Sequence, residues 1–262
     1  MSDAICDMHV HTNHSCDSKV GIEEYCAEAV RRGIDAICFT DHVDCNPRDV
    51  GYGHYNAEKF FDEFARAKEK YGARLSMLCG IEFAEPHLYR DELAQLSALP
   101  YDFILGTLHF WYKDMFPSGM VEAGIPAQVC YEHYWDAVLA AANAGGFDSL
   151  GHMDFPKRYY NELIIDEGKV REICGALVRS GICLEINTSS LRKNIAETMP
   201  GKEILAIYKS CGGKLVTVGS DAHRLGDLAG DNARAKSLIE HFGFEEVVFA
   251  GRKMKSASAM KR

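Results

Sequence analysis

The chain alternates between short apolar runs and segments of helical periodicity, and this alternation limits its fold more than any other feature. Each run is rich in β-branched residues and is bounded by Gly, Asp or Pro, which is typical of buried strands. Seven such runs occur, at residues 5–10, 36–40, 75–83, 103–110, 149–155, 183–187 and 214–219. Strict alternation of strands and helices predicts a parallel sheet, open or closed. A weaker eighth strand, residues 246–249, follows.

The helical segments carry recognisable start and stop signals. Residues 22–30 have helical spacing and are followed by Gly33, a residue that often ends helices. Asn56 is a suitable cap for a helix over residues 57–71, which Gly72 would end. The remaining helices are predicted at residues 89–99, 126–144, 166–180, 201–209 and 229–242.

Polar residues gather at one end of the predicted strands. All seven strands run into polar residues at their C-terminal ends, which is where barrel folds form their active sites. These segments are residues 9–11, 40–42, 80–82, 106–109, 151–154, 185–188 and 219–223. An open sheet would bind ligands only in the crevice at its switch point. We therefore expect the sheet to close into a barrel.

One domain accounts for the length of the chain. Barrels of this kind commonly form as a single domain of about 250 residues, and composition does not break over residues 1–250 of the 262. Residues 251–262 are basic among Ser and Ala, so we expect a frayed C-terminal tail there. The prediction is a single-domain α/β barrel over residues 1–250, followed by that tail.

The charge and the absence of certain segments narrow the partners. The net charge is −9, whereas a nucleic-acid binder needs a basic surface. No apolar run is long enough to span a bilayer, and residues 1–7 lack the pattern of a secretory signal. We therefore expect a cytoplasmic protein with neither a nucleic-acid nor a membrane partner. The sequence leaves the oligomeric state open, a homo-oligomer included.

The strand-end histidines point to a metal centre. His9 and His11 lie two residues apart on a strand, so both side chains project to the same face. Such a pair is common by chance, but several other strand ends also supply His, Asp or Glu. Nitrogen and oxygen ligands without cysteine suit Zn, Mn or Fe, and their number fits two or three divalent ions better than one. Ions so placed can activate water and hold a phosphoryl or carbonyl oxygen.

These motifs resemble those of the polymerase and histidinol phosphatase (PHP) superfamily, in order along nearly the whole chain. The matching segments are residues 7–12, 39–42, 80–82, 106–109, 151–152 and 219–223. The family fold is a distorted (β/α)7 barrel related to the TIM barrel, which agrees with the seven units counted above. Residues 151–158 and 185–193 are similar to the histidinol-phosphate phosphatase branch of this superfamily.

The resemblance implies three metal positions that share one carboxylate. The ligands would be His9, His11, Glu82 and Asp221 for the first, Glu82, His109 and His152 for the second, and Asp17, His42 and His223 for the third. Many relatives have histidine where this chain has Asp17, and His14 lies nearby as a competitor. Asp17 is favoured because its spacing from His11 matches the family.

The resemblance also implies an activity, the hydrolysis of a small-molecule phosphomonoester. The expected substrate is L-histidinol phosphate, an intermediate of histidine biosynthesis. Catalytic roles would fall to His42, Asp221 and His223. Arg158 and Arg192, which follow strands five and six, would bind phosphate, because the guanidinium fork matches two phosphate oxygens. Lys157 is the competing cation beside Arg158.

Three other functions stay open from the sequence. The chain could be a PHP phosphoesterase that acts on a nucleotide or another small phosphoester. It could be an amidohydrolase, although those enzymes commonly carry a metal-bridging lysine where this chain has Glu82. It could also be a non-catalytic metal-binding or polymerase-associated module.

Some neighbouring residues are weaker candidates. His54 lies in a loop, residues 44–55, that could cover the site, and His87 also follows a strand end. Asp154 and Asn187 are candidates for orienting the ligands through hydrogen bonds.

Overall fold

The strands of the protein form one sheet in which neighbours in space are also neighbours in sequence. The computed structural model describes residues 4–261. Strands β1 to β8 run parallel, and β9 pairs antiparallel with β8. Their bounds are β1 (Cys6–Val10), β2 (Ala36–Val43), β3 (Ser76–Ala84), β4 (Phe103–Thr107), β5 (Ser149–Leu150), β6 (Cys183–Asn187), β7 (Leu215–Gly219), β8 (Glu245–Ala250) and β9 (Lys253–Ser256).

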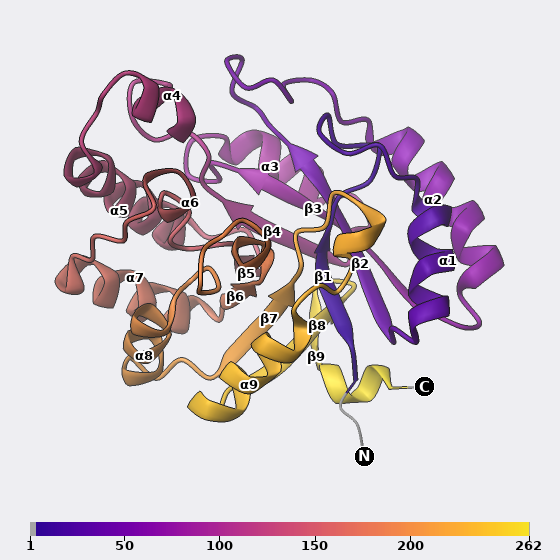
Figure 1. The fold of residues 1–262 in the computed structure, drawn as a ribbon. Coiled ribbons are helices and arrows are strands. Elements are labelled where there is room, and N and C mark those ends of the chain that lie inside the picture. Colours follow the sequence, from indigo (N-terminus) through magenta and orange to yellow (C-terminus); the bar gives the residue numbers. More distant parts are fainter. Residues whose placement is uncertain (1–3, 262) are drawn as a thin grey trace.

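The segment that follows β7 closes the sheet onto β1. The amide of Asp221 donates a hydrogen bond to the carbonyl of His9 (2.8 Å), and the amide of His11 donates one to the carbonyl of Ala222 (2.9 Å). Strands β1 to β7 therefore form the predicted distorted barrel, in agreement with the seven strand–helix units of the sequence. Figure 1 shows the helices on the outside of these strands.

The helices begin and end close to the predicted positions. Gly33 follows α1 in the left-handed conformation with φ 70°, and the Asn56 side chain accepts a hydrogen bond from the amide of Lys59 at the start of α2. The helices are α1 (Ile22–Arg32), α2 (Ala57–Tyr71), α3 (Arg90–Ser97), α4 (Pro117–Glu122), α5 (Ala127–Ala144), α6 (Lys157–Tyr160), α7 (Glu167–Ser180), α8 (Lys202–Ser210) and α9 (Asn232–Phe242), with shorter turns η1 (Ser189–Arg192), η2 (Leu225–Asp227) and η3 (Ala257–Met260). Among residues 4–261, no helix is both long and apolar enough to cross a bilayer.

Alternation along the strands separates two apolar layers. Side chains that point outward, such as Phe39, Ile81 and Ile186, pack against the helices in the larger core cluster. Inward side chains such as Cys38 and Leu105 fill the lower barrel. Nearer the C-terminal ends of the strands, the inward-pointing positions carry polar residues instead of apolar ones. On β2 and β3 the alternation that builds the core therefore also aims His42 and Glu82 into the barrel mouth, whereas the pairing of β1 shifts register between Asp7 and Val10, beside His9.

The C-terminal residues differ from the frayed tail expected from their composition. Residues 253–256 form β9, and Ala257 is buried in the cluster that fills the lower barrel. β8 begins beside the start of β7, while the Gly251 amide donates to the Asp102 side chain just before β4 (2.7 Å). β8 and β9 therefore cross the bottom of the barrel, and burial of β8 outweighs the polar composition of the last residues. Residues 1–3 and 262 lie outside the described part of the chain.

Two strands are shorter than predicted, and two helices were not predicted at all. β4 ends at Thr107 and β5 at Leu150, so the polar residues that follow them lie on loops instead of strands. The short helices α4 and α6 occupy these loops. Residues of α4 and α6 line the cavity described below. The wrongly predicted segments are therefore ones that shape the site.

Candidate metal centre

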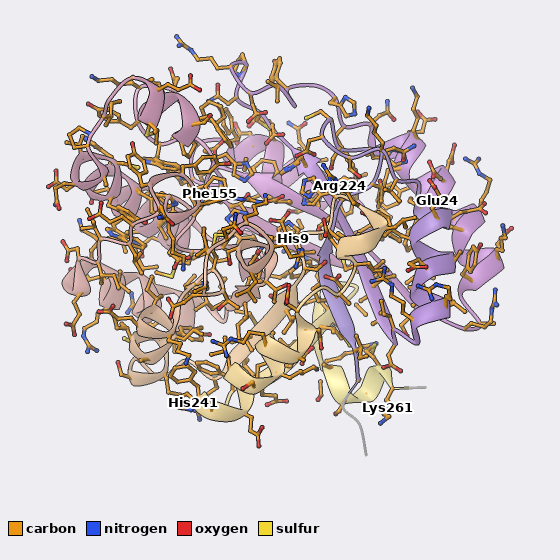
Figure 2. All side chains as sticks on the ribbon, in the orientation of Figure 1. His9, Glu24, Phe155, Arg224, His241 and Lys261 are labelled. Atoms are coloured by element: carbon orange, nitrogen blue, oxygen red, sulfur yellow. The ribbon has the colours of Figure 1, made fainter. Side chains whose placement is uncertain are left out.

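The predicted metal ligands meet at the C-terminal mouth of the barrel. A cavity of about 850 Å³ opens there, and seven of the nine predicted ligands line it, namely Asp17, His42, Glu82, His109, His152, Asp221 and His223. His9 and His11 lie beneath it and are fully buried. Figure 2 places His9 near the middle of the molecule, with Phe155 and Arg224 on either side of the mouth.

The first group of ligands surrounds one oxygen of Glu82. Its Oε2 lies 3.2 Å from His9 Nε2 and 3.3 Å from His11 Nε2. Asp221 Oδ1 lies 3.4 Å from His11 Nε2, and the two histidine Nε2 atoms are 2.9 Å apart. Because four donor atoms from β1, β3 and the segment after β7 face one point, this group can hold a divalent cation.

The second group surrounds the other oxygen of the same carboxylate. Glu82 Oε1 lies 2.9 Å from His152 Nε2 and 3.4 Å from His109 Nε2. The two Glu82 oxygens thus face different histidines. Oε1 faces two, and Oε2 faces His9, His11 and also His42, whose Nδ1 is nearest at 3.1 Å. This is the arrangement that a carboxylate bridging two cations requires.

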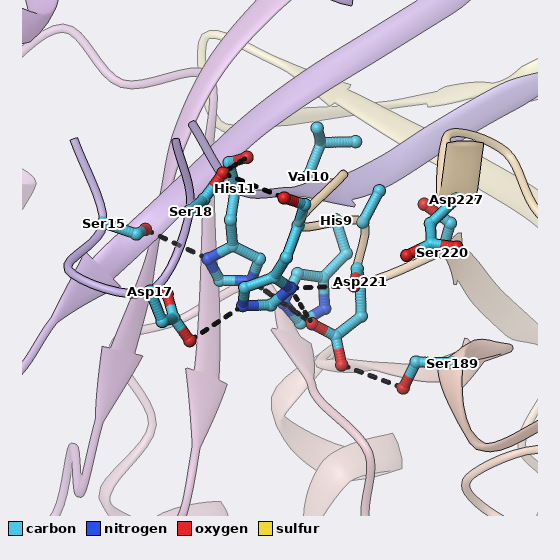
Figure 3. A network of polar contacts seen from close by, with 12 residues as sticks. His9, Val10, His11, Ser15, Asp17, Ser18, Ser189, Ser220, Asp221 and Asp227 are labelled. Carbon is cyan, nitrogen blue, oxygen red and sulfur yellow. Dashed lines mark hydrogen bonds and ion pairs between the residues drawn. The ribbon is translucent and has the colours of Figure 1, made fainter. Parts of the chain in front are cut away.

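The third group lies nearest to solvent. Asp17 Oδ2 lies 3.0 Å from His223 Nε2 and 3.6 Å from His42 Nε2. Figure 3 shows Asp17 turned towards the ligands His11 and Asp221. His14 is turned away and instead contacts Glu63 at 2.9 Å. The structure therefore brings Asp17, and not His14, to the cluster.

Residues behind the ligands fix their orientation, and sequence reasoning missed the most important of them. Glu185 Oε1 lies 2.6 Å from His9 Nδ1, so His9 donates a proton there and leaves the lone pair of Nε2 for a metal. Gly219 makes room for this contact, since a Cβ at that position would lie 2.2 Å from Glu185 Oε1. The inward register of Glu185 on β6, two residues before Asn187, was the available signal.

Hydroxyl groups hold two further ligands. Ser15 lies 3.1 Å from His11 Nδ1, and Ser189 donates a hydrogen bond to Asp221 Oδ2 (2.9 Å), as drawn in Figure 3. Asn187 in turn accepts a hydrogen bond from the backbone amide of Ser189 and donates one to Glu185. Asn187 therefore has the orienting position expected of it. Asp154 does not, because it pairs with Lys157 and accepts a hydrogen bond from the Gly201 amide.

The electrostatics prepare the cluster for a cation. Burial alone would raise the pKa of Glu82, but the surrounding histidines, His42 and His9 foremost, hold it well below its usual value. Burial, reinforced by the charges of His223 and His42, lowers the pKa of His11 to about 3. Glu82 is therefore ionised and His11 neutral at neutral pH, the forms that bind metals. Burial alone would lower the pKa of His9 and His42, but Glu185 and Glu82 raise the pKa of His9, and Glu82 raises that of His42 to about 9. Metal binding would therefore displace protons from these two rings.

The two predicted phosphate-binding arginines occupy different environments. Arg158 lines the cavity, with its Nη2 3.7 Å from Asp221 Oδ2. Arg192 also lines it, but its guanidinium contacts Asp227 (3.4 Å), Asp231 (3.2 Å) and the Ser220 carbonyl. Lys157 is buried, 2.6 Å from Asp154, and donates to the Thr198 carbonyl. Lys157 is thus held away from the cavity, while both arginines reach it.

Two further histidines lie outside the cluster. His54 is exposed on the loop of residues 44–55 and does not line the cavity, although Asp44, Arg48, Asp49 and Val50 of that loop do. The loop thus borders the site as expected, but through other residues than His54. His87 lies outside the cavity too.

The donor set fits two or three divalent ions. Four groups of His, Asp and Glu in the described chain have donor atoms within 4.8 Å of one another, and three of them contain all the predicted ligands except His152, which contacts Glu82 directly. Within residues 4–261, the buried Nδ1 atoms of His42 and His152 form no hydrogen bond, although His42 Nδ1 lies 3.1 Å from Glu82 Oε2. Ligand residues also have unusual backbone angles, with φ 53° at Asp221 and 22° at His152, as functional sites often do.

Comparisons with known proteins point to one family. Residues 7–189 match the PHP domain family. The chain is 29% identical to a probable histidinol-phosphatase of Deinococcus radiodurans over 95% of this chain and 98% of the relative. It is 26% identical to a histidinol-phosphatase of Lactococcus lactis over 95% of both chains. It also resembles the crystal structure of histidinol phosphate phosphatase from Lactococcus lactis in complex with zinc, L-histidinol and phosphate, with a TM-score of 0.79 and 25% identity over 97% of this chain and 100% of that chain.

Proposed function

Because the chain belongs to the PHP domain family, we propose that it hydrolyses L-histidinol phosphate to L-histidinol and phosphate. At a coarser level, the chain is a PHP metal-dependent phosphoesterase. Two observations support the finer proposal. Relatives named as histidinol-phosphatases match over nearly the full length, and a related enzyme holds zinc, L-histidinol and phosphate in its structure.

The observation that carries the proposal is the arrangement around Glu82. Its two oxygens face different histidines, two at Oε1 and three at Oε2, with contacts between 2.9 and 3.4 Å. Such a carboxylate suits the paired ions that phosphatases use. When bound, these ions supply Lewis acidity, lower the pKa of water and neutralise phosphoryl oxygens.

The chain's own residues would bind and orient the substrate. Arg158 would contact the phosphoryl group, because it lines the cavity and its only acidic partner in the described chain is Asp221 at 3.7 Å. His42, Asp221 and His223 also line the cavity, in agreement with the catalytic roles proposed for them. Glu185 and Ser189 would keep His9 and Asp221 aligned while substrate binds.

The amidohydrolase alternative has less support. Its metal-bridging lysine would have to come from a middle strand, and Lys157 is committed to Asp154 and the Thr198 carbonyl. A PHP phosphoesterase with another substrate remains the closest competitor, since the metal groups alone do not select the organic part of a phosphoester.

Phosphate release from a panel of phosphomonoesters tests the proposal. The panel contains L-histidinol phosphate, nucleoside monophosphates, glycerol phosphate and phosphotyrosine, each assayed with Zn, Mn and Fe. We expect the largest kcat/KM for L-histidinol phosphate. A preference of orders of magnitude for a nucleotide would support the competing substrate, and no release from any ester would favour a non-catalytic module.

A further inference from the structure

The cavity has an acidic pair that the metal groups do not use. Asp44 and Asp49, referred to below as the acidic pair, lie on the loop after β2 and line the cavity. Their carboxylate oxygens and a nitrogen of His109 lie within 4.8 Å of one another. The basic lining residues Arg158, Arg192, Lys193 and Arg224 come from the loops after β5, β6 and β7. The cavity is therefore charged in opposite senses on two parts of its lining.

Asp44 is buried without a hydrogen-bond partner, which is costly for a carboxylate. Only 4% of its side chain is exposed, and Oδ1 has no hydrogen-bond partner. Its one ion pair, with His109 Nδ1, is long at 3.8 Å. Gly51 allows the side chain to sit there, because a Cβ at position 51 would lie 2.3 Å from Asp44 Oδ2. The loop is thus built around an acceptor that lacks a donor.

No neighbouring cation of the loop neutralises the acidic pair. Arg48 lies between the two aspartates in sequence, but it pairs with the exposed Asp114 at 3.6 Å. Among residues 4–261, the hydrogen bond that the Asp49 side chain accepts comes from the Gly51 amide of its own loop. Two carboxylates this close repel each other, and a cation between them would relieve the repulsion.

An organic cation suits the acidic pair better than a fourth metal ion. His109 directs Nε2 to Glu82, 3.4 Å away, and turns Nδ1 towards Asp44. A neutral histidine whose Nε2 lone pair faces a metal carries its proton on Nδ1 and has no lone pair for a metal at that nitrogen. That leaves two carboxylates, which can accept the three N–H donors of an ammonium group.

We propose that Asp44 and Asp49 bind the ammonium group of the substrate and so select O-phosphorylated 2-amino alcohols. This rests on the proposed function and deepens it. The two nitrogens of His109 lie 3.8 Å from Asp44 and 3.4 Å from the bridging carboxylate Glu82, so one imidazole ring spans from one carboxylate to the other. In a 2-amino alcohol phosphate, two carbons separate the ammonium nitrogen from the ester oxygen. A phosphoryl group at the metal centre therefore places the ammonium near the acidic pair.

Matched substrate pairs test the subsite. L-Histidinol phosphate is compared with its deaminated analogue, 3-(imidazol-4-yl)propyl phosphate, and 2-aminoethyl phosphate with propyl phosphate. For Asp49→Asn we expect kcat/KM for the two amino esters to fall about 10–100-fold, as for loss of a charge-assisted contact. The two esters without the amine should change less than about threefold by the same reasoning, because they make no such contact. Because the readout is a ratio within one preparation, partial misfolding cancels.

Controls separate this subsite from other roles. Glu58→Gln removes an exposed carboxylate of α2 that does not line the cavity and should leave the ratio unchanged. Asp44→Asn should lower the ratio like Asp49→Asn, and metal per chain should stay at the wild-type value in Asp49→Asn. The proposal is overturned if the wild type does not prefer the amino esters, if Asp49→Asn lowers both members of a pair equally, or if it loses metal. Poor hydrolysis of L-histidinol phosphate with an intact preference for 2-aminoethyl phosphate would reject the proposed function alone and support the subsite.

Discussion

The floor and the wall of the cavity are built in different ways. The floor, here the nine predicted metal ligands, comes mostly from strand ends and the residues directly after them, and its deepest members His9 and His11 are fully buried. The wall, here Asp44, Asp49, Arg158 and Arg192, comes from loops and short helices. Floor side chains are aimed by the alternation of the strands, whereas each wall side chain depends on the local path of its loop.

This difference teaches where chemistry and specificity reside. The floor is shared by any member of a family that keeps the barrel and its strand-end motifs. The wall can change without disturbing the barrel, because loops tolerate substitution better than the elements they connect. Changes in the floor should therefore remove metal and activity together, while changes in the wall should alter substrate use with metal retained.

The largest effect is expected for Glu82→Gln in the floor. Loss of the shared carboxylate removes a ligand from two groups at once. We expect kcat to fall at least about a thousandfold, since metal catalysis contributes several kcal/mol, and metal per chain to drop. Elemental analysis and phosphate release measure both, with the exposed Glu203→Gln on α8 as control. Near-normal turnover with depleted metal would contradict the shared-carboxylate arrangement.

A smaller effect is expected for Glu185→Gln, which alters the partner of a ligand and not a ligand itself. A neutral amide still accepts the hydrogen bond from His9 Nδ1 but makes that ring less basic. We expect metal affinity to fall about 10–100-fold, the range seen for such partners, and added metal to rescue much of the activity. Competition with a chromogenic chelator measures the affinity. An unchanged affinity would mean that Glu185 only packs against His9.

The wall should respond differently at its two arginines. Arg158→Ala and Arg192→Ala should both keep full metal and lower kcat/KM for L-histidinol phosphate about 10–100-fold, as for one lost charge-assisted contact. Arg192→Ala should also reduce the free energy of unfolding by about 1–3 kcal/mol, because it releases Asp227, Asp231 and the Ser220 carbonyl. Steady-state kinetics and urea unfolding measure the two effects, with exposed Arg179→Ala as control. Equal free energies of unfolding for the two variants would contradict the proposal that Arg192, unlike Arg158, also stabilises the fold.

The smallest effect, on stability alone, is expected from Glu85 behind the floor. Burial raises the pKa of this carboxyl to about 7, although it accepts hydrogen bonds from the amides of His109 and Phe110. A pKa raised by folding stabilises the protein at low pH, and this stabilisation is lost as pH rises from about 4.5 to about 7. Glu85→Gln should therefore gain stability over the wild type across that window, by at most about 3 kcal/mol. Unfolding of the metal-free proteins at several pH values measures it, and a pH-independent difference would count against it.

The same contrast explains how much could be predicted from the sequence. The barrel and its inward ligands were predictable because strand periodicity fixes side-chain direction, as at His42 and Glu82. Glu185 was missed as a partner of His9 because that contact joins β6 to β1, and strand pairing across the ring is not written in local sequence. Asp44 was missed because only the folded loop shows that it lacks a partner.

The C-terminal residues show a second limit of prediction from sequence, because a segment predicted to be frayed is ordered. Lys253 and Lys255 look like part of a solvated tail, yet they lie on β9, which pairs with the buried strand β8. Tertiary pairing overrode local composition there. Arg158 and Arg192 were identified from their positions after strands five and six together with the family resemblance, and their different partners became visible only in the fold.

Metal removal and return tests the central claim, a metal-dependent phosphatase on a barrel that folds without metal, most directly. The protein is treated with chelator, and phosphate release from L-histidinol phosphate is followed during titration with Zn, Mn or Fe, alongside thermal unfolding. We expect activity to vanish on chelation, the fold to persist with a modestly lower Tm, and activity to return only after more than one ion per chain has bound. Full activity in the chelated protein, or cooperative unfolding on chelation at room temperature, would contradict the account.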